Sequence, residues 1–520
     1  MNRALKSPLF LCQLSGWKRC ATLFVLGAFL TLSFAPFFFW QSAVISLTLL
    51  LLFIEKADAP KQAFKDGWWF GWGHFSAGLY WFAHALLTDA EQFAWLIPFA
   101  IFGIPAVLAI YTGLTTYLSK RIAKTSAQLW LSFALCWVGL EFLRAHLFSG
   151  FPWNLLGYVW GVNNITIQSA SVFGVWGLSL ITALIASVPF FLIRNKANIE
   201  RSSVIFVVTS VAFLISLLAF GANRLSTIPQ SIDKKPHYVR LVQGNVAQHH
   251  KWNPAFQMDI FRTYVELSKQ PAKHPLSLIV WPESAMPFIP NEQKWVKQVI
   301  ADTTPENAFL MTGALRIERD EDYSAQSFAI WNSLYAFNSN GEIVTYYDKT
   351  HLVPFGEYIP LRSILPLTKI TAGSTDFSQG TGVKTLKIPS LPSFSPLICY
   401  EIIFPDKVIS QENKPDWMIN ITNDAWFGDS TGPYQHLQMA RFRAAEEGRP
   451  LIRAANTGVS AVFDGFGRTL GALNLNEKGI VDIKMPTIEP INTMYQKRYG
   501  LILLFLFVSV TLIILKIRKL

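Results

Sequence analysis

Long apolar stretches alternate with short polar segments through the first 221 residues, and the pattern then changes. An α-helix needs about 20 apolar residues to cross a bilayer. Stretches near this length lie at residues 20–33, 41–54, 68–87, 94–118, 127–149, 166–193, 203–221 and 499–515. Pro36 separates the first two, which predicts a tight hairpin of two spans. We therefore expect a seven-span membrane domain over residues 1–221 and a further span with a basic tail within 496–520.

Basic residues indicate how these spans are oriented. Lys and Arg gather before the first span and in every second loop after it, whereas the loop after the third span carries Asp89 and Glu91. The positive-inside rule then predicts that both termini are cytoplasmic. Residues 222–495 would lie outside, on the periplasmic side of a bacterial inner membrane. No small-residue cleavage site follows the first span, so we expect an uncleaved anchor.

The outer region is made of short β-rich runs separated by helical patterns. Several runs are apolar throughout, as strands buried on both faces are. Candidate strands are residues 237–244, 276–281, 308–314, 328–337, 342–347, 395–400, 417–422, 451–455 and 459–464, and candidate helices are 254–270, 291–302 and 434–447. Residues 464–467 predict a hairpin turn. Strands that alternate with helices predict a layered α/β domain.

Composition agrees with a membrane protein, since only 15% of residues are charged and 14% are aromatic. The net charge of +11 partly reflects the basic loops and does not indicate nucleic-acid binding. Four cysteines are too few for a disulfide framework. Three of them lie in or beside predicted spans, so Cys399 is the only cysteine of the outer region. It is a candidate reactive thiol, and the alternative is a buried structural cysteine.

Cys399 lies at the end of a strand-like run, and Glu283 and Lys349 end two similar runs. A thiol with a pKa of about 8.5 is mostly protonated at neutral pH and needs a neighbouring base. Glu283 is the candidate base. Lys349 and the backbone N–H of Tyr400 are candidates to stabilise a developing oxyanion. These groups would support acyl transfer through a thioester, and the membrane domain makes a lipid the first candidate for the acyl donor.

The segments around these three residues resemble a known family. Residues 281–283, 347–349 and 398–401 resemble the Glu–Lys–Cys triad of the nitrilase, or carbon–nitrogen hydrolase, superfamily. The resemblance is closest to the apolipoprotein N-acyltransferase family and covers nearly the whole chain. Further segments that carry it are residues 349–360, 423–428, 435–436, 441–449 and 456–458. It implies a multi-span α-helical membrane domain joined to an α/β nitrilase-like αββα sandwich.

The resemblance also implies a two-step reaction. Cys399 would take a fatty acyl chain from a phospholipid, typically phosphatidylethanolamine, and form a thioester. The α-amino group of a diacylglyceryl-modified N-terminal cysteine on an apolipoprotein would then attack. Glu283 would act as base and acid in turn, and Lys349 would stabilise each tetrahedral intermediate. No metal or soluble cofactor is implied.

Other residues carry over from the family by position. Glu357 and Glu401 resemble carboxylates that support the triad, and Tyr400 would shape the turn after the nucleophile. Trp252 matches a tryptophan near the lipid site, and Trp426 would belong to a mobile lid. Ordinary loop charges and packed aromatic side chains are the alternatives.

Some ionisable residues have no role in this chemistry. The histidines of the outer region show no metal-ligand spacing and are interpreted as structural: His249, His250, His351 and His436. Glu141 and Arg144 lie about one helical turn apart within the fifth predicted span. They form either a functional intramembrane pair or an interfacial anchor.

Two other functions are compatible with parts of this pattern. A membrane-tethered amidase or nitrilase would use the same Glu283, Lys349 and Cys399 and would give its acyl group to water. A transporter with an outer ligand-capturing domain would instead show paired hydrophobic halves with broken helices. The sequence shows no such symmetry.

Overall fold

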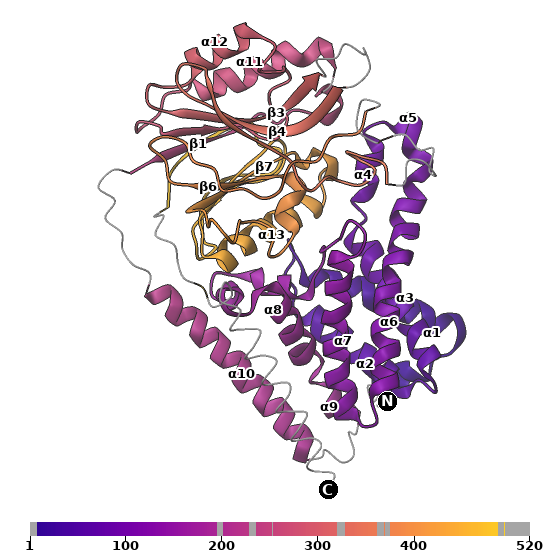
Figure 1. Ribbon diagram of the computed structural model, residues 1–520. Coiled ribbons are helices and arrows are strands. Elements are labelled where there is room, and N and C mark those ends of the chain that lie inside the picture. Colours follow the sequence, from indigo (N-terminus) through magenta and orange to yellow (C-terminus); the bar gives the residue numbers. More distant parts are fainter. Residues whose placement is uncertain are drawn as a thin grey trace, which may run out of the picture. The chain divides into compact units, whose positions relative to one another are not determined.

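The computed structural model describes residues 8–194, 201–227, 236–251, 253–319, 328–360, 369, 375–486 and 493. The chain divides into two compact units (Figure 1). The helical unit comprises residues 1–83, 95–228 and 493–520, and the sheet unit comprises residues 84–94 and 229–492. The predicted domain boundary at 221/222 lies within the last long helix of the helical unit, and residues 84–94 group with the sheet unit.

The seven spans predicted before residue 222 all fall on helices. Four segments of the described residues are long and apolar enough to cross a membrane: 90–122, 126–146, 166–193 and 203–226. The predicted span at 499–515 lies outside the described residues. The longer helices are α1 (Gly16–Leu30), α2 (Gln41–Lys56), α3 (Pro60–Gly78), α6 (Ile104–Ile122), α7 (Ser126–His146), α8 (Ala170–Ser187) and α10 (Arg201–Ser226). The helical unit is therefore a multi-span membrane domain, as predicted.

Helices α1 and α3 touch through their backbones. A Cβ atom on Gly27 would lie 1.8 Å from the Phe70 carbonyl oxygen, and one on Gly73 would lie 1.9 Å from that of Phe24. Small residues at such contacts are typical of helix packing in membranes, where lipid supplies no hydrophobic driving force between helices. The same two helices are joined by an ion pair between Arg19 and Asp66, with a nitrogen–oxygen distance of 2.5 Å.

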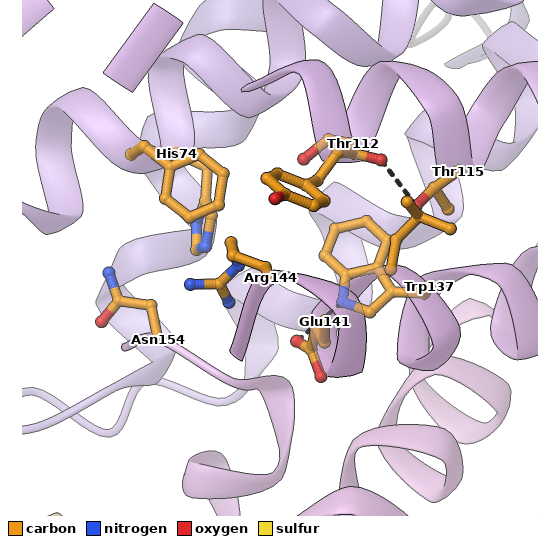
Figure 2. Close-up of a pocket in the computed structure, with 10 residues that line it drawn as sticks. His74, Thr112, Thr115, Trp137, Glu141, Arg144 and Asn154 are labelled. Atoms are coloured by element: carbon orange, nitrogen blue, oxygen red, sulfur yellow. Dashed lines mark hydrogen bonds between the residues drawn. The ribbon is translucent and has the colours of Figure 1, made fainter. Parts of the chain in front are cut away.

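A small polar cavity of about 20 Å³ lies between α3, α6 and α7, with Glu141 and Arg144 in its wall (Figure 2). Glu141 Oε1 accepts a hydrogen bond from the Leu156 N–H at 2.9 Å. Arg144 donates to the carbonyl oxygens of Phe151 and Trp153 at 2.6 and 2.8 Å. Both side chains thus bind the segment that follows α7, and the cavity has room for about one water molecule.

Two mixed β-sheets form the sheet unit. One has the strand order β11-β1-β2-β3-β4-β5, and the other has the order β10-β9-β8-β7-β6. Strands β1–β3 and strands β6–β8 are parallel, and antiparallel strands flank them. Their bounds are β1 (Tyr238–Gln243), β2 (Leu278–Val280), β3 (Phe309–Arg319), β4 (Phe328–Phe337), β5 (Ile343–Asp348), β6 (Phe394–Ile398), β7 (Trp417–Thr422), β8 (Leu451–Ala455), β9 (Ser460–Phe463), β10 (Thr469–Leu473) and β11 (Gly479–Lys484).

The two sheets pack face to face over one apolar core, to which Leu241 and Val280 contribute from one sheet and Ile398 and Ile419 from the other. Helices cover the outer faces (Figure 1). They are α11 (Gln257–Ser268) and α12 (Lys294–Thr303) on the first sheet and α13 (Gly432–Glu447) on the second. This is the predicted αββα sandwich.

Each of the nine predicted strands is present, with small differences at the ends. Cys399 and Tyr400, predicted as the end of a strand, open the short 3₁₀ helix η9 (Cys399–Ile403). The predicted turn at 464–467 joins β9 to β10, and the Gly467 N–H donates to the Asp464 carbonyl oxygen. Strands β10 and β11 were not predicted, because these edge strands are half-exposed and carry a weak apolar pattern.

Candidate active site

Cys399 sits on a sharp turn at the carboxyl end of β6. Its φ angle is +51°, in the left-handed region that residues other than glycine rarely adopt. Such strained backbone persists only where the surrounding structure holds it, and it is concentrated at functional sites. The side chain is 8% exposed and lies at the margin of the core between the sheets. The turn therefore brings the thiol out of the strand direction while keeping it buried.

Glu401 holds this turn in place from two sides. Its Oε2 accepts from the Ile398 N–H at 2.7 Å. Its Oε1 accepts from the Tyr347 hydroxyl at 2.9 Å and from the Thr350 N–H at 2.7 Å. Burial raises the pKa of the Glu401 carboxyl, and these hydrogen bonds oppose that shift. One carboxylate thus ties the nucleophile turn to the loop that follows β5, where Lys349 lies.

Lys349 lies between two carboxylates. Its Nζ is 2.9 Å from Glu357 Oε1 and 3.5 Å from Glu283 Oε1, and the side chain is only 1% exposed. Burial lowers the pKa of Lys349, but the negative charges of Glu357 and Glu283 outweigh it, so the pKa is raised above its ordinary value. The ammonium group is therefore charged at neutral pH.

Asn332, in the middle of β4, orients both carboxylates. Its Nδ2 donates to Glu283 Oε1 at 2.7 Å and to Glu357 Oε1 at 3.0 Å. Glu283 Oε1 is thus occupied, whereas its Oε2 is buried and has no hydrogen-bond partner among the described residues. A buried acceptor of this kind is costly unless it is used. The arrangement leaves one oxygen of Glu283 available to take a proton.

The Cys399 thiol lies within electrostatic range of both groups. Burial and the negative charge of Glu283 raise the pKa of the thiol, and the positive charge of Lys349 lowers it; the net pKa is about 12. At neutral pH the thiol is therefore protonated, and a base must remove its proton during the reaction. The Lys349 ammonium group lies 3.5 Å from the Glu283 carboxylate, and the charges of both act on the buried Cys399 thiol. The catalytic roles of these three residues remain predictions.

Lys251 is a second buried lysine at this site and was not predicted. Its Nζ donates to the main-chain carbonyl oxygen of Glu283 at 2.8 Å. Burial lowers the pKa of Lys251 to about 8, and the charges of Glu283 and Cys399 act in the opposite direction. Two lysines thus balance the two carboxylates, Glu283 and Glu357. Lys251 gives no signal in the sequence, because it lies in a loop outside any regular pattern.

The aromatic residues predicted near the site lie as follows. Tyr400 is half-buried, and its ring contacts that of Phe404 at a centroid distance of 5.1 Å. Trp426 is half-buried in the 3₁₀ helix η10 (Asp424–Phe427), which follows β7. Trp252 lies outside the described residues. The side-chain roles predicted for these three remain predictions.

The histidines of the sheet unit make ordinary contacts. His249 and His250 pack against each other, and His351 packs against Phe404. His436 is buried beside Asp424 at 2.9 Å. Within the described part of the chain, no cluster of three or more His, Cys, Asp or Glu side chains could hold a metal ion.

Comparison with known proteins gives the class of each unit. Residues 239–493 match the family described as carbon–nitrogen hydrolase, which is the class of the sheet unit. Residues 26–188 match the family described as the apolipoprotein N-acyltransferase N-terminal domain. An amidase from Nesterenkonia sp. is a looser structural neighbour, with 19% identity, a TM-score of 0.36, and coverage of 52% of this chain and 95% of that one.

Whole-chain relatives narrow this class to one family. The apolipoprotein N-acyltransferase of Rhodopseudomonas palustris is 38% identical over 521 residues, which cover 97% of this chain and 96% of the relative. That of Brucella melitensis is 38% identical over 492 residues, with 91% of each chain covered. The chain belongs to the apolipoprotein N-acyltransferase family.

Proposed function

We propose that this chain transfers a fatty acyl chain from a membrane phospholipid to the N-terminal amine of diacylglyceryl-cysteine in apolipoproteins. The observation that carries the proposal is the buried group of Cys399, Glu283 and Lys349, in a chain that also has membrane-spanning helices. Family membership supports the same conclusion, because the relatives over the whole chain are named for this activity.

In the first step, Cys399 Sγ attacks the ester carbonyl carbon of the phospholipid while Glu283 Oε2 takes the thiol proton. Lys349 Nζ and the Tyr400 N–H stabilise the negative charge that develops on the carbonyl oxygen. The C–O bond then breaks, and Glu283 returns the proton to the departing oxygen. The products are a thioester on Cys399 and a lysophospholipid, and Glu283 is ionised again.

In the second step, the α-amino group of the acceptor attacks the thioester carbonyl and Glu283 takes one of its protons. The C–S bond breaks, the departing sulfur recovers that proton, and an amide is left on the acceptor. The acyl chain must be kept from water between the two steps, because hydrolysis would waste it. A thiol that is only 8% exposed meets this requirement. Neither step calls for a metal or a soluble cofactor.

The supporting residues take roles that follow from their contacts. Glu357 holds the Lys349 ammonium group, and Glu401 holds the nucleophile turn. Tyr400 shapes that turn and supplies its N–H. We assign Trp426 to a lid over the site and Trp252 to the lipid-binding side, by their resemblance to family positions.

The orientation in the membrane belongs to the same proposal. Basic loops on alternate sides favour cytoplasmic termini and a sheet unit on the periplasmic face of a bacterial inner membrane. The membrane domain would have seven spans over residues 1–221 and one more within 496–520. Phosphatidylethanolamine is the proposed donor, because the resemblance to the family implies it.

The proposal can be tested with the purified full-length protein in detergent. Vesicles of phosphatidylethanolamine with a labelled acyl chain are supplied together with a diacylglyceryl-cysteine peptide. We expect labelled N-acyl peptide and lysophospholipid, and neither product from Cys399→Ala. Cys136→Ala, in α7, is the matched control and should retain activity. Release of labelled fatty acid without N-acyl peptide would instead identify a hydrolase that passes the acyl group to water.

A further inference from the structure

A group of four buried polar side chains lies next to the main chain of Cys399. We call it the carbonyl clamp. Each member is at most 1% exposed. The members are Asn420 on β7, Asp424 on η10, His436 on α13 and Arg453 on β8. None of them takes part in the acyl-transfer steps above, so their burial in one place needs a separate explanation.

Two members of the clamp meet the main-chain carbonyl oxygen of Cys399. His436 Nε2 lies 3.3 Å from this oxygen, and Asn420 Nδ2 lies 3.5 Å from it. A carbonyl oxygen can only accept hydrogen bonds, so Asn420 Nδ2 donates to it, and His436 does so from the ring form that carries its proton on Nε2. The carbonyl of the nucleophile is therefore held from two elements that are distant in the sequence.

Arg453 holds both donors in position from behind. One of its terminal nitrogens donates to Asn420 Oδ1, and the other donates to Asp424 Oδ2 at 2.6 Å. In the form with the proton on Nε2, His436 Nδ1 accepts from that same Arg453 nitrogen, which lies 3.2 Å away. Although burial raises the pKa of Asp424, the charge of Arg453 and the contact with His436 hold it at about 2. The carboxylate is thus ionised, and one guanidinium group orients both arms of the clamp.

Fixing this carbonyl also fixes the next N–H group. The peptide bond between Cys399 and Tyr400 is planar, so in the trans form its C=O and N–H point in opposite directions. Cys399 has φ of +51°, a conformation that the chain does not adopt without support. The hydrogen bonds to the carbonyl oxygen therefore set the direction of the Tyr400 N–H.

We propose that the carbonyl clamp aims the Tyr400 N–H at the oxyanion of each tetrahedral intermediate. His436, Asn420, Asp424 and Arg453 are then positioning residues that act through the Cys399–Tyr400 peptide. This inference rests on the proposed function, in which that N–H is an oxyanion donor. It assigns to His436 a role beyond the structural one that its sequence context predicts.

The test compares His436→Phe with His436→Gln in the purified full-length protein. Phe removes the donor, whereas the Gln amide nitrogen restores one at nearly the position of Nε2. For His436→Phe we expect kcat to fall about 10-fold to 100-fold, less than the loss for deleting an oxyanion donor outright, with KM unchanged. Acylation of Cys399 and transfer to the peptide should slow by similar factors in single-turnover experiments. His436→Gln should recover most of the rate.

A loss of rate caused by misfolding must be distinguished from one caused by a misoriented Tyr400 N–H group. The fraction of folded enzyme is measured by size-exclusion chromatography and circular dichroism, and rates are expressed per folded molecule. His274→Phe makes the same change at an exposed histidine that stacks on Tyr238 and should have wild-type rates. A folded His436→Phe protein with wild-type acylation, or a His436→Gln protein as slow as His436→Phe, would overturn the proposal.

A second variant covers the case in which His436→Phe does not fold. Asn420→Asp keeps the side-chain shape and the oxygen that faces Arg453, but it loses the donor to the Cys399 carbonyl. We expect a smaller, several-fold fall in kcat with KM unchanged, and an unchanged kcat would contradict the clamp. If Cys399→Ala itself remains active, the proposed function fails. If Cys399→Ala is inactive while both clamp variants are normal, only this inference fails.

Discussion

Two buried carboxylates, one in each unit, differ in how their oxygens are used. Asp66 in the helical unit accepts from Arg19 Nε at 2.8 Å and Gln62 Nε2 at 2.9 Å through Oδ1, and from a second Arg19 nitrogen through Oδ2. Glu283 in the sheet unit has partners on Oε1 alone, within the described residues. Both oxygens of Asp66 are thus occupied by hydrogen-bond donors, whereas Glu283 keeps one buried oxygen without a partner among the described residues.

The paired cations differ in the same way. Arg19 meets Asp66 with two parallel N–H groups, a geometry that fixes both side chains. Lys349 carries three N–H donors, and its contacts with Glu357 and Glu283 use two of them. In the proposed mechanism the third donor binds the oxyanion. The Arg19–Asp66 pair is therefore saturated and joins α1 to α3, whereas the Lys349 pairs in the sheet unit are incomplete.

The largest effect is expected when the Glu283 carboxylate is replaced by a neutral amide. Glu283→Gln keeps the hydrogen bond to Asn332 but cannot take a proton, so kcat should fall by about 10²-fold to 10⁴-fold. The thermal unfolding temperature should change little. Acyl transfer and unfolding are measured on the same preparation. Near-normal turnover would show that Glu283 is not the base, and the difference drawn between Glu283 and Asp66 would then have no functional meaning.

Asp66→Asn should have the opposite profile. It leaves Arg19 buried against an uncharged partner, which costs about 3–5 kcal/mol of unfolding free energy for a buried pair. Turnover per folded molecule should be unchanged, because Asp66 takes no part in the reaction. The change in stability is measured by thermal unfolding in detergent. Asp58→Asn, at an exposed aspartate nearby, is the control. A loss of turnover without a loss of stability would contradict this prediction.

Asn332→Leu sharpens the comparison by removing the donor that orients both carboxylates. Hydrogen bonds to charged groups contribute about 1.5–3 kcal/mol, so a loss of about 10-fold to 100-fold in kcat is expected if this energy is used for orientation. The exposed Asn340→Leu serves as the control. If the rate is unchanged while the protein is folded, Glu283 is held by Lys349 and the surrounding backbone without help from Asn332.

The smallest effect concerns the ionisation of the thiol itself. Because the pKa of Cys399 is raised to about 12, its alkylation by iodoacetamide should keep rising beyond pH 9 without a midpoint near 8.5. Since Glu283 raises this pKa, Glu283→Gln should move the pH profile toward lower pH. The rates are followed by mass spectrometry in a protein with Cys12, Cys20 and Cys136 replaced by serine. In the protein with Glu283 intact, a midpoint of the alkylation rate below pH 9 would contradict the burial of the thiol.

The same shift has a consequence for stability. The unfolded thiol ionises at about pH 8.5 and the folded one at about 12, so the unfolded state binds fewer protons between these values. The free energy of unfolding therefore falls as the pH rises through this range. Cys399→Ala should lose this part of the pH dependence.

Much of the architecture could be predicted from the sequence, because it depends on local patterns. Apolar stretches of bilayer length and apolar strands bounded by turns determine the helices and strands, and residues at strand ends gather at sheet edges. Strands β10 and β11 were missed because edge strands with half-exposed faces lack a strong pattern.

The parts of the site that could not be predicted depend on contacts between distant residues. Asn332 lies inside a strand, where an isolated polar residue gives no indication of its partner. Lys251 lies in a loop and is defined only by its contact with the Glu283 carbonyl. His436 reaches Cys399 across 37 positions of the chain. The sequence shows that such groups are present, and only the fold shows what they bind.

The central claim is that Cys399 carries the acyl group between the two substrates. It is tested most directly by incubating the full-length protein with phosphatidylethanolamine vesicles, without acceptor, and analysing its peptides by mass spectrometry. The account predicts a fatty-acyl adduct on the peptide that contains Cys399, sensitive to hydroxylamine and lost when the diacylglyceryl-cysteine peptide is added. An adduct on another residue, or N-acylation of the peptide by Cys399→Ala, would contradict it.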